Sequence, residues 1–169
     1  MTDEPGGLAA PGTLSEPGTL SEPGQGSRHA TPWESPGFLL WRATLRWQRS
    51  LTAKLAPLGL THAQFVLLAS TCWLGRDGRL PSQRELADQA GTDLMMTSQV
   101  VRTLESKGYV ARGHDPADAR IRRLAVTPAG QQLALRAIAV VEAADVAFFL
   151  GTDQAALLDL LRGLALAPR

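Results

Sequence analysis

The chain contains little of what reactive sites are usually built from. Cys72 is the one cysteine among 169 residues, so no intrachain disulfide can form and nothing in the composition indicates an oxidising compartment. The three histidines, His29, His62 and His114, are far apart, and no nucleophile or carboxylate pair stands at catalytic spacing. Glycine-rich phosphate loops are absent, and the adjacent His114 and Asp115 would need a third metal ligand from elsewhere. We therefore expect neither an enzyme nor a protein with a metal ion or cofactor.

Long apolar segments are also lacking. No apolar run approaches the roughly 20 residues that a membrane-spanning helix needs. The first residues are acidic and rich in proline and glycine, which is unlike a signal peptide. We therefore expect a cytoplasmic protein without a membrane partner.

The net charge is small but unevenly distributed. Over the whole chain it is +1. Residues 1–34 hold five acidic side chains against one arginine, which sums to −4, so the rest of the chain carries +5. A mildly basic body with an acidic tail is compatible with DNA binding, although many proteins without that role share this distribution.

The acidic segment has low sequence complexity. The hexapeptide PGTLSE occurs twice within residues 11–22 and is followed by PGQGS. Proline blocks helix, glycine loosens the chain, and few apolar side chains are available to bury. We expect residues 1–34 to be disordered. A tail without function, an additional helix and a flexible arm that touches DNA are the alternatives for this segment.

Helix start and stop signals divide the rest of the chain into short elements. Ser35 before Pro36 is a typical helix start, and Ser82 with Glu85 forms an S-x-x-E capping box. The runs YVARGHD and IRRLAVT are typical of strands joined by the turn PADAR. The expected limits of the six helices are Ser35 and Gly59, Thr61 and Gly75, Ser82 and Gly91, Thr92 (as the N-cap) and Gly108, Pro128 and about Leu150, and Asp153 for the start of the last.

The expected order is four helices, two strands and two helices. A short helix, a tight Thr/Gly turn, a second helix and a two-stranded hairpin make up a winged helix-turn-helix. The fold class is therefore mainly α with a small β-wing of two or three strands, flanked by long apolar helices. In the helix that follows Thr61, the face expected to be buried carries Phe65, Leu68 and Cys72.

The helix after the Thr/Gly turn has one apolar and one polar face. The face expected in the core carries Leu94, Thr97, Val101 and Leu104, with Val100 beside them. The opposite face carries Met95, Ser98, Gln99, Arg102 and Ser106 and is almost free of carboxylates. Serine and glutamine can read the donors and acceptors of base edges, and arginine can pair with guanine or phosphate. An ordinary amphipathic helix with a solvated face is the alternative.

The hairpin concentrates arginines near its tip. Leu124 and Val126 point to one side of the second strand and Arg123 to the other, whereas Arg122 lies near the tip. Arg120, in the tip itself, can enter a narrow minor groove, where the negative potential is strongest. Asp118 can hold that guanidinium through a charge-assisted hydrogen bond. A solvated run of charges in a turn is the alternative, and helix and hairpin together favour DNA binding.

These segments resemble the MarR family of transcriptional regulators from about Ser35 to the C-terminus. The segments that carry the resemblance are LTHAQFVLL, RELADQAGTDLMMTSQVVRTLESKGYVAR and DPADARIRRLAVTPAG, in the family's order and spacing. The resemblance implies a homodimer, held together by the first and last helices, that binds a pseudo-palindromic operator in double-stranded DNA. It also implies that the recognition helix spans Thr92–Lys107 and that the wing carries Asp118 and Arg120.

The chain departs from the family at two positions of the recognition helix and at one position of the wing. The family often has arginine where Gln99 stands, an acid where Arg102 stands, and a basic residue where Ala119 stands. The operator sequence therefore does not follow from the resemblance. The residues expected to contact DNA are Thr92, Met95, Ser98, Gln99, Arg102, Asp118, Arg120 and Arg122.

The long flanking helices are expected to form a dimer interface. We assign residues 35–60 and 128–169 to dimerisation and residues 61–127 to the DNA-binding lobe. The apolar side chains that exceed the needs of one small domain are Leu135, Ile138, Val141, Val146 and Phe149, together with Trp41 and Leu45. An intrachain α-hairpin stacked on the first helix is the alternative.

The resemblance also implies a small-molecule effector, bound between the dimer region and the DNA-binding lobe. The candidate lining is Trp41, Trp47, Cys72 and Trp73, and large residues that merely fill a helical core are the alternative. The expected function is a DNA-binding transcriptional regulator, most simply a repressor that the effector releases. Two other functions stay open: a winged-helix module that binds proteins, and redox sensing through Cys72, although a buried thiol has a raised pKa.

Overall fold

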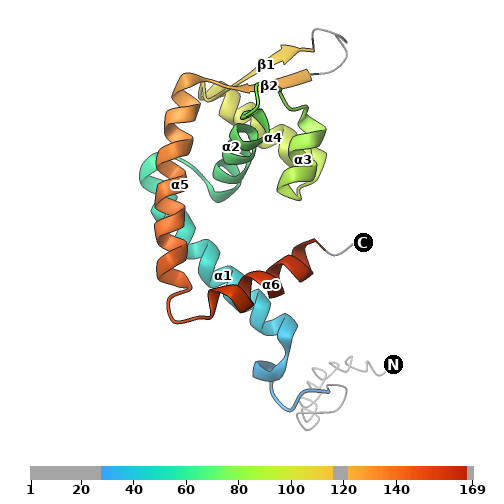
Figure 1. Ribbon diagram of the computed structural model, residues 1–169, viewed down its shortest axis with the longest axis vertical. Coiled ribbons are helices and arrows are strands. Elements are labelled where there is room, and N and C mark those ends of the chain that lie inside the picture. Colours follow the sequence, from blue (N-terminus) through green and yellow to red (C-terminus); the bar gives the residue numbers. More distant parts are fainter. Residues whose placement is uncertain (1–27, 116–121, 167–169) are drawn as a thin grey trace, which may run out of the picture. The chain divides into compact units, whose positions relative to one another are not determined.

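A computed structural model describes residues 28–115 and 122–166 of the chain (Figure 1). The chain divides after Arg42 into two compact units, residues 1–42 and 43–169. The wing-tip predictions for Asp118 and Arg120, and most of the predicted disordered tail, lie outside the described residues.

The described part of the first unit contains local order before the first long helix. A short 3₁₀ helix, η1, spans Pro32–Glu34, and α1 spans Pro36–Leu55 and so continues into the second unit. The amide N–H of Phe38 donates to Oγ of Ser35 at 3.4 Å, in agreement with the predicted helix start. Pro32 opens the η1 turn, and the N–H of Ser35 closes it on the carbonyl oxygen of Pro32 at 3.1 Å.

The second unit follows the predicted order of elements. From α1 onward there are four α-helices, two strands and two further α-helices, with the short η2 between α1 and α2. Their bounds are η2 Ala56–Leu58, α2 His62–Gly75, α3 Gln83–Ala90, α4 Leu94–Ser106, β1 Val110–His114, β2 Arg122–Val126, α5 Pro128–Phe148 and α6 Gln154–Ala165.

Local capping chemistry explains where most helices begin. Thr61 and Ser82 each close a complete capping box, with Gln64 and Glu85 respectively. The predicted N-cap of α4 was one residue too early: Asp93 caps this helix, and its Oδ1 accepts from the N–H of Met96 at 2.8 Å. Thr92 instead belongs to the end of α3, because Gly91 turns left-handed and the N–H of Thr92 bonds back to the carbonyl of Ala87 at 3.0 Å.

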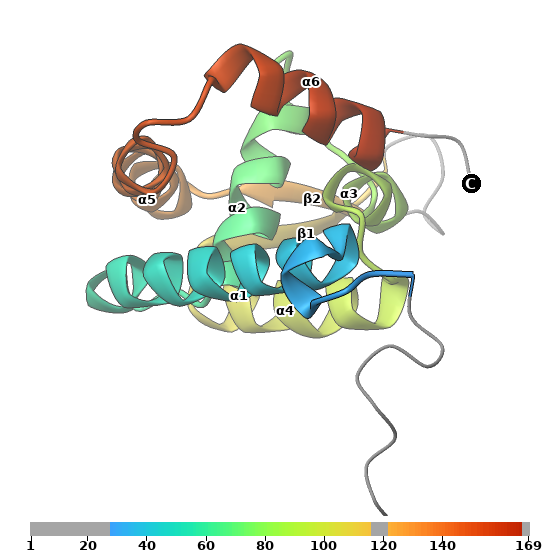
Figure 2. The same ribbon diagram turned by 90° about the horizontal axis from the view of Figure 1, so that it is seen from below.

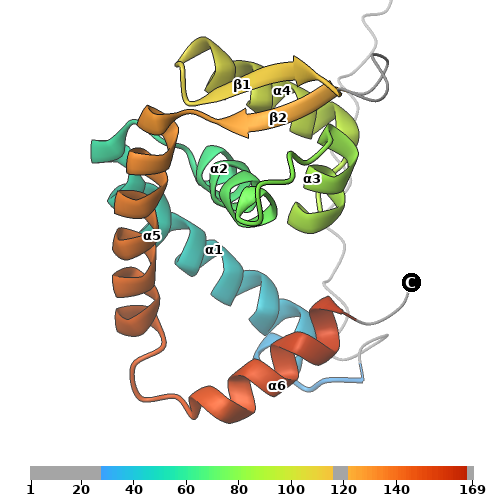
Figure 3. The same cartoon turned by 45° about the horizontal axis from the view of Figure 1, so that its top comes forward.

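The core surrounds α2, which contacts α3, α4, α5 and β2; Figures 2 and 3 show α2 beside α3 and the strands. Because α2 has neighbours on several sides, its fully buried residues differ from the predicted face. Leu67, Leu68 and Thr71 are buried, whereas Phe65 and Cys72 are half-buried and pack against the core.

On α4, Thr97, Val101 and Leu104 are buried as predicted, and Val100 packs half-buried against the core. Leu94 was predicted to face the core but is 46% exposed. It is the first residue of the helix, next to the cap Asp93, and so lies at the edge of the packed region.

The β-wing has two strands and one additional bridge. β1 and β2 pair antiparallel from Val110 opposite Val126 to His114 opposite Arg122. The segment before α3 joins them, because Ser82 forms an isolated bridge with Arg123 and the N–H of Leu124 donates to the carbonyl of Pro81 at 2.8 Å. The start of β2 is therefore attached to the segment that leads into α3.

No single helix among the described residues is long and apolar enough to cross a membrane, although one bent pair, Pro36–Leu58 with His62–Gly75, meets the length and composition conditions together.

Candidate nucleic-acid interface

The outward face of α4 presents polar and apolar side chains to solvent. Met95 is 82% exposed, Gln99 and Arg102 are exposed, and Ser98 is half-buried. None of these positions is acidic. This face can therefore approach a polyanion without a carboxylate on it to repel the phosphates.

The acidic and polar neighbours of this face are engaged within the chain. Glu105, also on α4, lies 3.4 Å from Nε of Arg112 on β1. Nη2 of the same arginine donates to the carbonyl of Ser98 at 3.4 Å. Arg112 thus links the wing to the middle of α4, a role that the sequence did not reveal because its partners lie on another element.

Thr92 is less accessible than Met95, Gln99 and Arg102. It is half-buried, and its hydroxyl lies 2.8 Å from the hydroxyl of Thr97, which is fully buried. A tie of this kind holds the turn between α3 and α4, so Thr92 is placed to shape the helix-turn-helix as much as to touch DNA.

On the wing, the two arginines that open β2 lie in different surroundings. Arg122 is exposed, and its Nη1 lies 2.9 Å from Nε2 of His114 on the paired strand. Arg123 is half-buried, and its Nε donates to Asp115 Oδ2 at 2.5 Å. As the alternation of side chains along the strand predicts, Arg123 and Leu124 point to opposite sides of β2. Leu124 is buried, and Arg123 belongs to a cluster of ion pairs.

That cluster, which we call the Arg123 cluster, consists of Arg79, Glu85, Asp115 and Arg123. Oε1 of Glu85 lies 2.5 Å from Nη1 of Arg79, and Oε2 lies 3.2 Å from Nη1 of Arg123. The second oxygen also accepts the N–H of Ser82 at 2.7 Å. These bonds, first that from Ser82 and then that from Arg79, lower the pKa of Glu85 from 4.5 to about 2.

The aromatic residues predicted to line an effector site have different surroundings. Trp47 donates its indole N–H to Asp145 Oδ1 at 2.7 Å, and its ring stands edge-on to His62 at 5.0 Å. Burial lowers the pKa of His62, against the opposing effect of Asp145. Trp73 is exposed, and the guanidinium of Arg76 lies 4.1 Å from the centre of its ring.

Cys72 and Trp41 are the other two residues predicted to line the effector site. Cys72 is half-buried, and burial raises the pKa of its thiol. A higher thiol pKa means less reactive thiolate at neutral pH, which disfavours redox sensing. Trp41 belongs to the first unit, where its ring centre lies 6.0 Å from that of Phe38.

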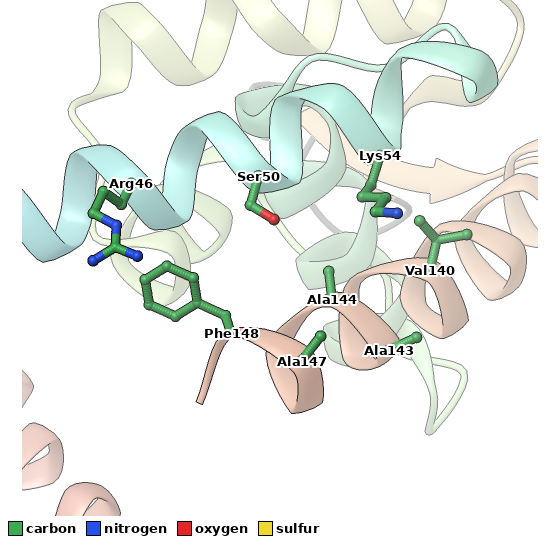
Figure 4. Close-up of a pocket in the computed structure, with 8 residues that line it drawn as sticks. All are labelled: Arg46, Ser50, Lys54, Val140, Ala143, Ala144, Ala147 and Phe148. Carbon is green, nitrogen blue, oxygen red and sulfur yellow. The ribbon is translucent and has the colours of Figure 1, made fainter. Parts of the chain in front are cut away.

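A cleft of about 540 Å³ lies elsewhere, between α1 and α5 (Figure 4). Arg46, Ser50 and Lys54 project from one side of α1. The opposite wall, on α5, is apolar and consists of Val140, Ala143, Ala144, Ala147 and Phe148. Within the part of the chain that the structure describes, no carboxylate lines the cleft, and none of the four predicted effector residues does. Across the described residues, no group of three potential ligands is placed to hold a metal ion.

A helix-turn-helix made of α3 and α4, followed by a small wing tied to both, defines a winged helix-turn-helix protein. The chain belongs to the MarR family, whose model matches residues 60–121, and whose members are transcriptional regulators rather than enzymes. The HTH-type transcriptional regulator YdcH of Bacillus subtilis is 45% identical over 123 residues, which cover 73% of this chain and 84% of YdcH.

Solved structures of one regulator, CouR, are similar over most of the chain. CouR from Rhodococcus jostii RHA1 bound to p-coumaroyl-CoA has a TM-score of 0.73 at 28% identity, over 82% of this chain and 97% of CouR. The transcriptional repressor CouR bound to a 23-mer DNA duplex has a TM-score of 0.69 at 30% identity, over 79% and 94% of the two chains. The predicted fold class and family are therefore confirmed.

Proposed function

We propose that the protein is a repressor that binds a pseudo-palindromic operator as a homodimer and is released by a small-molecule effector. The observation that carries this proposal is the outward face of α4, where Met95, Gln99 and Arg102 are exposed with no acidic residue among them. The DNA-bound structure of CouR supports it, because a repressor of similar fold and sequence binds duplex DNA.

The proposed contacts divide into two groups. Gln99 and Arg102 read base edges in the major groove, with Met95 and Ser98 beside them and Thr92 at the turn that leads into α4. Arg120 and Arg122 contact the backbone and minor groove from the wing, and Asp118 orients Arg120.

The dimer is proposed from apolar surface that one chain leaves in water. Leu135 and Val146 on α5 and Leu160 and Leu164 on α6 are all exposed. Such surface is costly to leave in water, at about 25 cal/mol for each Å². A two-fold dimer would bury this surface in both subunits. It would also present two α4 helices to half-sites roughly 34 Å apart.

The cleft between α1 and α5 is the proposed effector site. Arg46 and Lys54 supply positive charge on one wall, and Phe148 and three alanines make the other wall apolar. This combination suits an organic anion with a flat apolar body. That CouR is similar to this chain and binds p-coumaroyl-CoA supports a small-molecule effector of some kind.

Selection of bound duplexes from a random DNA library, at two salt concentrations, tests operator binding. We expect an enriched palindrome with half-sites about ten base pairs apart, bound orders of magnitude more weakly at the higher salt because several phosphates are neutralised. No enriched motif, or binding that salt does not weaken, would favour a protein-interaction module instead.

Single substitutions test the division of contacts. Arg120→Ala is expected to weaken binding of all operator variants alike, by about tenfold. Gln99→Ala and Arg102→Ala are expected to change the preferred base at one position each. Uniform losses for all three variants would refute the division.

The effector site is tested by the ratio of operator affinity without and with ligand, using a panel of aromatic carboxylates. We expect Arg46→Gln combined with Lys54→Gln to abolish the effect of any active compound, and Trp73→Ala to leave the ratio unchanged. The opposite pattern would place the effector among Trp41, Trp47, Cys72 and Trp73.

A further inference from the structure

The Arg123 cluster connects three segments that are separate in sequence. Arg123 on β2 bonds to Asp115, which follows the last residue of β1, and to Glu85 in the first turn of α3. Its Nη1 also donates to the carbonyl of Leu80 at 3.2 Å. One guanidinium thus joins the end of β1, the start of β2 and the start of the helix-turn-helix.

The surroundings of Arg123 are those of a structural cation and not of a phosphate contact. Its side chain is 21% exposed, and that of Asp115 is 12% exposed. Two carboxylates already neutralise it, whereas the neighbouring Arg122 is exposed. The planar guanidinium suits this position, because its five N–H donors can serve several acceptors at fixed angles.

Asp115 and Arg123 flank the segment of the hairpin that carries Arg120. Asp115 directly precedes residues 116–121, and Arg123 is the second residue after them. Arg123 therefore fixes the point at which the chain leaves β1, and it does so relative to α3, which packs against α4.

We propose that Arg123 is a positioning residue that sets where the wing meets DNA, acting through Asp115 and Glu85. This inference rests on the proposed function. If the Arg123 side chain is removed, the wing remains paired and keeps its backbone bonds to the segment before α3, but it loses the side-chain bonds to Asp115, Glu85 and Leu80. Contacts made by the wing then weaken, while those made by α4 persist.

A double-mutant cycle on operator binding tests the proposal. In the otherwise native dimer, Arg120→Ala is expected to weaken binding about tenfold. In an Arg123→Ala background the same change is expected to cost no more than about threefold, because the wing contact has already been weakened. Arg102→Ala on α4 is expected to cost the same factor in both backgrounds. Equal costs for Arg120→Ala in both backgrounds would overturn the proposal.

Two further variants keep the result interpretable. Arg76→Ala removes one positive charge from an exposed pair with Asp77 and should leave the cost of Arg120→Ala at its native value. Arg123→Lys replaces Arg123→Ala if the alanine variant does not fold, because a single ammonium cannot span both carboxylates and the carbonyl of Leu80. If neither Arg102→Ala nor Arg120→Ala weakens binding, both this inference and the proposed function are overturned.

Discussion

At the scale of single residues, Gly130 decides how α5 attaches to the DNA-binding lobe. A Cβ at this position would lie 2.0 Å from the carbonyl oxygen of Tyr109. Thr127 holds the contact in place: its hydroxyl accepts from the N–H of Gly130 at 3.0 Å and donates to the carbonyl of Gly108 at 2.7 Å. The T-x-x-G pattern therefore combines a helix cap with a backbone contact that excludes any side chain.

Gly130→Ala is expected to lower the free energy of unfolding by about 1–3 kcal/mol, since the new methyl group forces α5 away from Tyr109. Gly163→Ala on α6 is the matched control, because a Cβ there meets nothing within 4 Å. We expect the control to be neutral or stabilising by up to about 1 kcal/mol. Urea unfolding followed by circular dichroism measures both, and similar losses would contradict the close contact.

At the scale of elements, the start of α3 is where helix, loop and wing meet. Glu85 completes the capping box with Ser82 and pairs with Arg79 from the preceding loop and Arg123 from β2. A helix of eight residues is too short to be stable by itself, so its position depends on such attachments.

Glu85→Gln is expected to make the free energy of unfolding less dependent on pH in the acidic range. The pKa of Glu85 is about 2 in the folded protein against an ordinary 4.5, so the unfolded chain takes up the proton first as the pH falls. The stabilisation is complete above the unfolded pKa and is lost as the pH falls from there towards the folded value. Between about pH 5 and about pH 3, the native protein should therefore lose more stability than Glu85→Gln, as measured by urea unfolding. Equal losses would show that the carboxylate is not stabilised in the fold.

At the scale of the whole molecule, α6 has an inner and an outer apolar face. Leu157, Leu158 and Leu161 line a cleft with the end of α5. Leu160 and Leu164, one turn apart on another face, are each 62% exposed. Part of the apolar surface of α6 therefore faces α5, and the exposed remainder is available to the proposed dimer.

Leu160→Asp combined with Leu164→Asp is expected to raise the dissociation constant of the dimer by about 100-fold or more, because a two-fold interface contains each change twice. Sedimentation velocity over a range of concentrations measures it. Arg162→Gln, on the same helix but at an exposed polar position, should leave the dimer intact. A dimer that survives the double change would exclude α6 from the interface.

The sequence by itself determined the elements, because capping, left-handed glycines and apolar periodicity act over a few residues. Thr61, Ser82 and Asp153 all cap the helices they were expected to cap. The N-cap of α4 was misassigned by one residue, because the turn at Gly91 draws Thr92 into the end of α3. The outward face of α4 was also predictable, since helical spacing decides which side chains share a face.

Contacts between distant segments were decided by the tertiary structure alone. The partners of Arg123 include Leu80 and Glu85, which lie 43 and 38 residues away. The cleft likewise brings the cations of α1 opposite a wall of α5 that lies some ninety residues later in the chain. Local patterns place a side chain on a face of its own element, but the group that it contacts there depends on how the elements pack. This packing pairs Arg123 with Asp115 and Glu85 and leaves the neighbouring Arg122 exposed.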